Sequence, residues 1–352
     1  MKDRRSSREL MAMLGLDIPI VQAPMAGFQG QLMASAVCNS GALGSIPCAL
    51  LGPEALQKEL ATLAAATTRS YNVNFFCHDM PDVDAAIESA WLARLDRYYR
   101  ELQVGDDDRV ATPLRMPFDH TSADLLGDLR PRMVSFHFGL PSVDLLERVR
   151  GWGSVVASSA TTVEEARWLE ARGVDVIIAQ GLEAGGHRGS FLAHDLAQQS
   201  GTFALLAQLV AAVDVPVIAA GGIADAQGVV AALALGAAAV QIGTSYLLCP
   251  EATTSPVHRQ ALRANPPRGT DITNVFSGRP ARGIRNRLME ELGPIDESVP
   301  AFPLASAALA PLRRKAERLG LDGFSPLWAG QNLSGCREIP AAELTRDLAG
   351  AI

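Results

Sequence analysis

The sequence predicts an α/β protein that folds as a (β/α)8 TIM barrel with a smaller, mostly helical second lobe. Three observations lead to this prediction. Eight apolar runs have the length of strands, helical patterns separate most of them, and the alternation stops near residue 255. The chain has 352 residues and is 48% hydrophobic, which is sufficient for a large buried core.

The apolar runs are typical of parallel strands that are buried on both faces. They cover residues 18–25, 42–47, 70–76, 133–138, 154–159, 174–179, 215–220 and 238–248. Helical patterns cover residues 32–39, 53–66, 82–103, 143–150, 162–172, 202–213 and 226–235. Thr162 followed by Glu165 predicts the start of a helix, and Gly173 and Gly236 predict helix ends before the next strand.

A doubly wound open sheet is the competing fold. The count of eight runs favours the barrel, and Pro24 and Met25 stand where the glycine-rich dinucleotide motif of an open sheet would begin. We expect an acidic, proline-containing loop at residues 105–123. The expected domains are the barrel at 1–254, a proline-rich helical lobe over the barrel mouth at 255–324, and a segment returning to the barrel at 325–352.

Composition and charge exclude several classes of function. The formal net charge is -7 and no long basic tract is present, so a nucleic-acid partner is not expected. No apolar run is long enough to span a membrane, and the first ten residues lack the apolar core of a secretory signal. The five cysteines show no C-x-x-C spacing, so we expect a cytoplasmic protein without a metal site.

The stretch from Gln180 to Gly189 is the most informative part of the chain. It follows a predicted strand and reads Q-G-L-E-A-G-G-H-R-G, with the imidazole of His187 among four glycines. Glycines let the backbone approach a flat or anionic ligand, because they carry no Cβ. A simple turn with a spare histidine is the alternative. His137, at the end of an earlier strand, either lines the same pocket and contacts substrate or packs in the core.

The last two strands predict a phosphate site. Gly221 and Gly222 follow the seventh strand, and Gly243 and Thr244 follow the eighth, where backbone N–H groups can face an anion. The alternative is that these glycines only permit tight turns. The other strand ends carry amides, which suit the edge of a heteroaromatic ring, rather than acidic clusters or a Schiff-base lysine. These features fit flavin mononucleotide, FMN.

Seven motifs together resemble the nitronate monooxygenase family, over residues 18–331. They are P-I-V-Q-A-P-M at 19–25, N-V-N-F-F at 72–76, G-L-E-A-G-G-H-R-G at 181–189, A-G-G-I at 220–223, V-Q-I-G-T at 240–244, S-G-R-P-A-R-G at 277–283 and W-A-G-Q at 328–331. The resemblance implies an FMN-bound barrel that oxidises alkyl nitronates, such as propionate 3-nitronate, with O₂ to a carbonyl compound and nitrite.

The resemblance also assigns roles to residues by position. His187 matches the active-site histidine of the family. The residues implied to contact FMN are Ala23, Met25, Asn74, Gln180, Gly185, Gly222, Gln241, Ile242, Gly243 and Thr244. An imidazole can hydrogen-bond the nitronate anion or remove the α-proton of a neutral nitroalkane, and the sequence leaves this choice open.

Two other functions stay open at this point. Related barrels share the E-A-G-G-H loop, so an NAD(P)H-dependent FMN reductase of quinones or enoyl thioesters is one alternative. A non-redox lyase, isomerase or binding protein with the same phosphate site is the other. The sequence does not fix the oligomeric state, and a homodimer is compatible with it.

Overall fold

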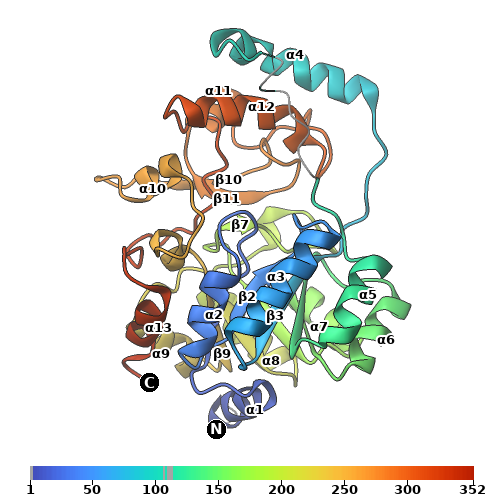
Figure 1. The fold of residues 1–352 in the computed structure, drawn as a ribbon, viewed down its shortest axis with the longest axis vertical. Coiled ribbons are helices and arrows are strands. Elements are labelled where there is room, and N and C mark those ends of the chain that lie inside the picture. The colour runs from blue at the N-terminus through green and yellow to red at the C-terminus, as the bar shows by residue number, and fades with distance from the viewer. Residues whose placement is uncertain (1–2, 106–107, 109–113) are drawn as a thin grey trace.

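The computed structural model describes residues 3–105, 108 and 114–352, and a parallel barrel forms its larger part (Figure 1). The strands of the barrel are β1 (Ile20–Gln22), β2 (Gly44–Pro47), β3 (Tyr71–Phe76), β4 (Met133–His137), β5 (Val155–Ala160), β6 (Val176–Gln180), β8 (Val217–Ala220) and β9 (Ala239–Ile242). They form one 8-stranded sheet in the order β1-β9-β8-β6-β5-β4-β3-β2. A parallel bridge between Val21 and Leu43 closes it, which confirms the predicted barrel.

Helices surround this barrel, most of them where the alternating pattern predicts. They are α2 (Gln31–Asn39), α3 (Pro53–Ala66), α5 (His120–Leu129), α6 (Val143–Gly151), α7 (Val163–Glu170), α8 (Thr202–Ala212), α9 (Ala226–Ala234) and α13 (Ala341–Ala349). The Thr162 side chain accepts a hydrogen bond from the N–H of Glu165, 3.2 Å away, at the start of α7. Gly173 and Gly236 have φ of +74° and +101°, the left-handed conformation that ends a helix most easily at glycine.

Three sequence predictions differ from the structure. The last predicted strand, 238–248, ends at Ile242, and Thr244–Leu248 form a 3₁₀ helix whose Leu247 and Leu248 pack in the lobe. The loop predicted at 105–123 ends at Asp119, whose carboxylate caps α5 by accepting from the N–H of Ser122. Residues 106–107 and 109–113 of that loop lie outside the described part. Helices α1 (Asp3–Leu14), α5 and α13 were not predicted.

Helix α1 covers the amino end of the barrel, at the foot of Figure 1. Leu10 and Leu14 of α1 are fully buried and join a core cluster with Val21, Ile178 and other strand residues. Since one end of the barrel is filled in this way, a ligand site is expected at the opposite, carboxyl end.

The second lobe contains strands as well as helices. It includes α10 (Pro256–Leu262), β10 (Thr270–Thr273), β11 (Ala281–Ile284), α11 (Arg287–Leu292) and α12 (Ala305–Arg318). Strand β11 pairs antiparallel with both β10 and the short β7 (Gly186–His187), so the glycine loop is the third strand of the lobe's sheet. The lobe therefore holds His187 directly.

Helix α4 (Ala85–Glu101) packs on this lobe rather than on the barrel (Figure 1). Its buried residues Trp91, Leu95 and Tyr98 share a core cluster with residues of α12 and β11. The lobe thus combines two separate stretches of the chain, and the domain division at residue 254 stays a prediction. Among the described residues, no helix is both long and apolar enough to cross a membrane.

Candidate active site

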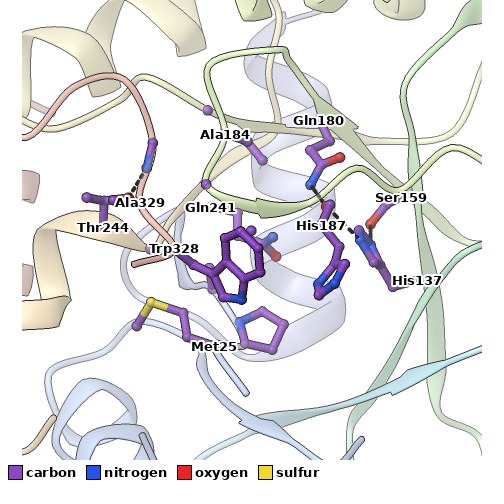
Figure 2. A pocket seen from close by; sticks show the side chains of 18 of the residues that line it. Met25, His137, Ser159, Gln180, Ala184, His187, Gln241, Thr244, Trp328 and Ala329 are labelled. Carbon is purple, nitrogen blue, oxygen red and sulfur yellow. Dashed lines mark hydrogen bonds between the residues drawn. The ribbon is translucent and has the colours of Figure 1, made fainter. Parts of the chain in front are cut away.

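A cavity opens at the carboxyl ends of the barrel strands, below the lobe, and Figure 2 shows its lining. Its empty space, counted together with the part open to solvent, is about 1240 Å³. The sequence-predicted residues that line it are Ala23, Met25, Asn74, His137, Gln180, Gly185, His187, Gly222, Gln241, Gly243 and Thr244. Ile242 is not among the lining residues. It is 1% exposed, packs in the barrel core, and accepts a backbone hydrogen bond from Ala23.

The turns after β8 and β9 present unpaired backbone donors. Gly221 and Gly222 have φ of +120° and +73°, which side-chain-bearing residues rarely adopt. Among the described residues, the N–H groups of Gly222, Gly243 and Thr244 have no hydrogen-bond partner. Unpaired N–H groups at two neighbouring strand ends suit an anionic group such as a phosphate.

The three amide side chains that the sequence singled out differ in their contacts. Both polar atoms of the Gln180 side chain make hydrogen bonds. Its Nε2 donates to the carbonyl oxygen of His187 at 2.9 Å, and its Oε1 accepts from the N–H of Gly189 at 2.8 Å. Asn74 donates from Nδ2 to Oγ of Ser135 at 2.9 Å. Oε1 of Gln241 is buried and has no hydrogen-bond partner among the described residues. An orphaned oxygen in a cavity wall requires a donor from a ligand or from water.

Arg188 holds the glycine loop in place through hydrogen bonds of its side chain. Its side chain is fully buried, and its guanidinium donates to Oε1 of Gln199 and to the carbonyl oxygens of Gly181 and Gln180, each at 2.8 Å. Burial lowers the pKa of Arg188 to about 10, so it remains charged at neutral pH. The loop is therefore rigid despite its glycines.

The segment Trp328–Gln331 lies at the cavity. Trp328 lines it, and the N–H of Gly330 donates to Oγ1 of Thr244 at 2.9 Å (Figure 2). The N–H of Gln331 donates to the carbonyl oxygen of Glu183 at 2.9 Å. A Cβ on Gly185 would lie 2.6 Å from the backbone of Ala329, so glycine is required there by this segment.

His187 projects into the cavity from β7. Its Nε2 lies 2.8 Å from Oγ of Ser277 in the lobe, and its ring centroid lies 5.2 Å from that of Phe302 and 5.5 Å from that of Trp328. No hydrogen-bond partner of Nδ1 is found in the described part of the chain. Burial, followed by the charges of Arg115 and other nearby basic groups, holds the pKa of His187 well below its usual value. The imidazole is therefore neutral at pH 7, with Nδ1 available to a ligand.

His137 lines the cavity but has both ring nitrogens engaged. Nδ1 lies 2.9 Å from Oγ of Ser159, and Nε2 lies 3.1 Å from the carbonyl oxygen of His187 (Figure 2). Because a carbonyl oxygen only accepts, Nε2 carries the proton and Nδ1 accepts from the Ser159 hydroxyl. Burial lowers the pKa of His137 to about 3.

Charged side chains of both signs lie at or near the cavity. Arg115 lines it, and burial lowers the pKa of its guanidinium to about 10. Arg279 stacks over the ring of Phe138, 3.8 Å from the ring centroid. Glu183 also lines the cavity, but its carboxylate accepts from the N–H and the hydroxyl of Thr202.

The residues of this site to which sequence reasoning gave no role include Arg115, Arg188 and Ser277. The last two lie inside the motifs 181–189 and 277–283, so a signal was present, although not their contacts. Arg115 lies in the predicted loop 105–123 and had no distinguishing pattern. In the described residues, no cluster of at least three His, Cys, Asp or Glu side chains is arranged to hold a metal ion.

The comparison with protein families covers almost the whole chain. A family model described as nitronate monooxygenase matches residues 7–350. A nitronate monooxygenase of Paraburkholderia phytofirmans is 39% identical over 357 residues, covering 99% of this chain and 96% of that one.

Two solved structures are also similar over nearly their full length. One is described as nitroalkane oxidase from Streptomyces ansochromogenes, with a TM-score of 0.86, 36% identity, and 97% of each chain covered. The other is FabK from Thermotoga maritima, with a TM-score of 0.72, 26% identity, and coverage of 97% of this chain and 95% of that one.

Proposed function

The chain belongs to the nitronate monooxygenase family of oxidoreductases, and from this premise we propose that it oxidises alkyl nitronates, such as propionate 3-nitronate, with O₂. The products are a carbonyl compound and nitrite. We propose FMN as the cofactor, in the cavity at the carboxyl ends of the strands. When bound, the flavin supplies the electron transfer that amino-acid side chains do not provide.

The residues present fit a flavin with a phosphate tail. The N–H groups of Gly222, Gly243 and Thr244 would hold the phosphate, because they are unpaired at two adjacent turns. The buried, orphaned Oε1 of Gln241 would accept a hydrogen bond from the ring edge. Met25 and Ala23, which also line the cavity, would lie against the ring as apolar contacts.

The observation that carries the nitronate assignment is the neutral His187 in a cavity that Arg115 also lines. A nitronate is an anion, and Arg115 contributes positive charge to the cavity. The Ser277 hydroxyl has two acceptors within reach, Nε2 of His187 at 2.8 Å and the carbonyl oxygen of Arg279 at 3.3 Å. We propose that it donates to the nearer one, which leaves the proton of the neutral imidazole on Nδ1. Nδ1–H then donates to a nitronate oxygen and orients the substrate.

This arrangement favours preformed nitronate over neutral nitroalkane. A base that removes an α-proton works best with a pKa near the working pH. The pKa of His187 is held well below its ordinary value, mainly by burial, so it is a weak base. We propose that His187 binds and orients the nitronate rather than generating it.

Anaerobic mixing tests this function against the reductase alternative. We expect the flavin absorbance of the purified protein to change rapidly on adding an alkyl nitronate, and to change little with NADH or NADPH. Rapid bleaching by either nucleotide, together with no response to a nitronate, would assign the protein to the reductases. A purified protein that takes up no FMN at all would favour a non-redox function.

A further inference from the structure

We propose that His137 is a positioning residue for His187: with Nδ1 bonded to Ser159, its Nε2–H joins Gln180 in a two-donor clamp on the carbonyl oxygen of His187. This inference rests on the proposed function of His187 and deepens it, because it identifies what sets the place of that imidazole in the cavity.

The clamp consists of two convergent hydrogen bonds. Nε2 of Gln180 donates to the carbonyl oxygen of His187 at 2.9 Å, and Nε2 of His137 lies 3.1 Å from the same oxygen. A carbonyl oxygen has two lone pairs, so these donors saturate it. Gln180 also accepts from the N–H of Gly189 at 2.8 Å, so the loop is held on both sides of Arg188.

Three adjacent strands of the barrel carry the residues of the clamp. His137 ends β4, Ser159 lies in β5, and Gln180 ends β6, and these strands are neighbours in the sheet. Phe136 and Ser158 are paired across β4 and β5, which places the residues that follow them side by side. Groups supported by paired strands hold a neighbouring loop more precisely than groups on a mobile segment.

Gly189 has a steric role in this arrangement. A Cβ at this position would lie 2.8 Å from Cε1 of His137 and 3.0 Å from Cβ of Ser159, closer than real contacts allow. The glycine therefore makes room for the His137 ring under the loop. This last glycine of the loop is explained by a protein contact and not by a ligand.

The contacts of His137 exclude a role in proton transfer. Both ring nitrogens are committed, one to Ser159 and one to His187, so neither faces a substrate. Burial lowers the pKa of His137 to about 3, so the same donor pattern persists throughout the neutral pH range. The ring acts through the backbone of His187, and its own charge does not change during turnover.

Two substitutions at position 137 test the clamp in the flavin-loaded protein. His137→Gln places an amide N–H about where Nε2 stands, since both atoms are the same number of bonds from Cβ, whereas His137→Leu removes the donor. We expect His137→Leu to lower kcat for a nitronate by about tenfold or more, because a displacement near 1 Å has costs of this order. We expect His137→Gln to restore most of kcat and to leave the shape of the pH profile unchanged.

Two results would overturn the proposal. Equal, full activity in both variants would show that the ring only packs. Equal inactivity in both, with one limb of the pH profile lost, would make His137 a proton-transfer group. Flavin content and Tm are measured for each variant, and Ser159→Ala provides a milder perturbation that removes only the group bonded to Nδ1. We expect kcat of this variant to lie between those of the Gln and Leu variants.

A second readout does not depend on turnover. In the flavin-loaded protein labelled with ¹⁵N-histidine, the signals missing from His137→Gln belong to His137. We expect them to show a protonated Nε2 and a bare Nδ1 at pH 7. An Nδ1–H form or a protonated ring would overturn the clamp. If no variant and no wild-type sample oxidises nitronates, the proposed function fails, and the ¹⁵N signals still decide the state of His137.

Discussion

The hydroxyl oxygen of Ser277 lies 2.8 Å from Nε2 of His187, and this contact joins the lobe to the glycine loop at the active site. Ser277 follows β10 in the lobe, and His187 forms β7 after the sixth strand of the barrel. The two residues are 90 positions apart in the chain. The orientation of the imidazole therefore depends on both parts of the molecule.

The His187 imidazole should be needed for turnover and not for flavin retention. We expect His187→Leu to keep its flavin and to lose about 100-fold in kcat/KM for a nitronate, the order of loss when an oriented hydrogen bond to a developing charge is removed. Ser277→Ala keeps the imidazole and frees its orientation, so we expect a smaller loss. The check is steady-state kinetics at matched flavin content. Unchanged kcat/KM in His187→Leu would make the histidine purely structural.

The pH dependence of kcat/KM should not show the inflection that a histidine of ordinary pKa would produce. The pKa of His187 is lowered by burial and by neighbouring cations, so the ring stays neutral from well below its usual pKa up through pH 9. Because kcat/KM reports the free enzyme, we expect no inflection near pH 6.5 with preformed nitronate. We also expect much slower turnover of the parent nitroalkane. A nitroalkane used as efficiently as its nitronate would contradict the weak-base assignment.

Gly222→Val should weaken flavin binding through the phosphate turn. Gly222 has φ of +73°, which is strained for valine, and an added Cβ would make a tight contact 3.3 Å from Cβ of Glu183. The matched control is Gly320→Val, because Gly320 has φ of +72° and no heavy atom within 4 Å of an added Cβ. We expect both variants to lose stability from backbone strain and only Gly222→Val to lose flavin affinity in a fluorescence titration. Equal flavin affinity in the two would argue against the turn as the phosphate site.

Gln241→Leu should reduce flavin affinity by removing the orphaned oxygen. The buried Oε1 gains a partner only when a ligand supplies a donor, and one such hydrogen bond contributes about 1 kcal/mol. We therefore expect an increase in the flavin Kd of about fivefold, measured by the same titration. Gln198→Leu, at an exposed position, serves as the control. An unchanged or lower Kd in Gln241→Leu would remove this residue from the flavin site.

The protein should lose stability at mildly acidic pH. Burial lowers the pKa of His258 to about 4 and that of His78 to about 4. Between pH 6.5 and 4 the unfolded chain binds protons that the folded chain does not, so the free energy of unfolding falls as the pH falls. At pH 5 each such histidine accounts for about 2 kcal/mol of this loss.

His258→Phe removes the contribution of one histidine to this acid-induced loss of unfolding free energy. His258 packs edge-on against Phe28, with ring centroids 5.2 Å apart, and its ring nitrogens have no hydrogen-bond partner among the described residues. We expect the variant to show a smaller difference in Tm between pH 7 and pH 5. His120→Gln, whose side chain is 68% exposed, is the matched control and should keep the wild-type difference. A wild-type pH dependence in His258→Phe would contradict the buried, neutral state.

The barrel could be predicted because its signal is local. Each strand is a short apolar run, and the topology then brings residues as distant as Asn74 and Gln241 to one cavity. The prediction failed at Gly243, where the apolar run continues to Leu248 although the strand has ended. An apolar run indicates that its side chains are buried, but it does not identify the part of the protein that covers them. Leu247 and Leu248 pack in the lobe.

The remaining parts of the site depend on contacts that no local pattern contains. Strand β7 is only Gly186–His187, too short for an alternating pattern, and it is a strand because β11 lies beside it. His137 had two open interpretations in the sequence. Its contacts with Ser159 and with the His187 backbone come from strand neighbours and a distant loop, so only the folded chain reveals them.

Nitrite release tests the central claim most directly. Wild-type protein and His187→Leu are brought to equal flavin occupancy, a preformed alkyl nitronate is added in air, and nitrite and oxygen are followed together. The account predicts that wild-type protein releases nitrite while it consumes oxygen, and that His187→Leu does so about 100-fold more slowly. Flavin-loaded wild-type protein that releases no nitrite, or a variant that matches it, would contradict the account.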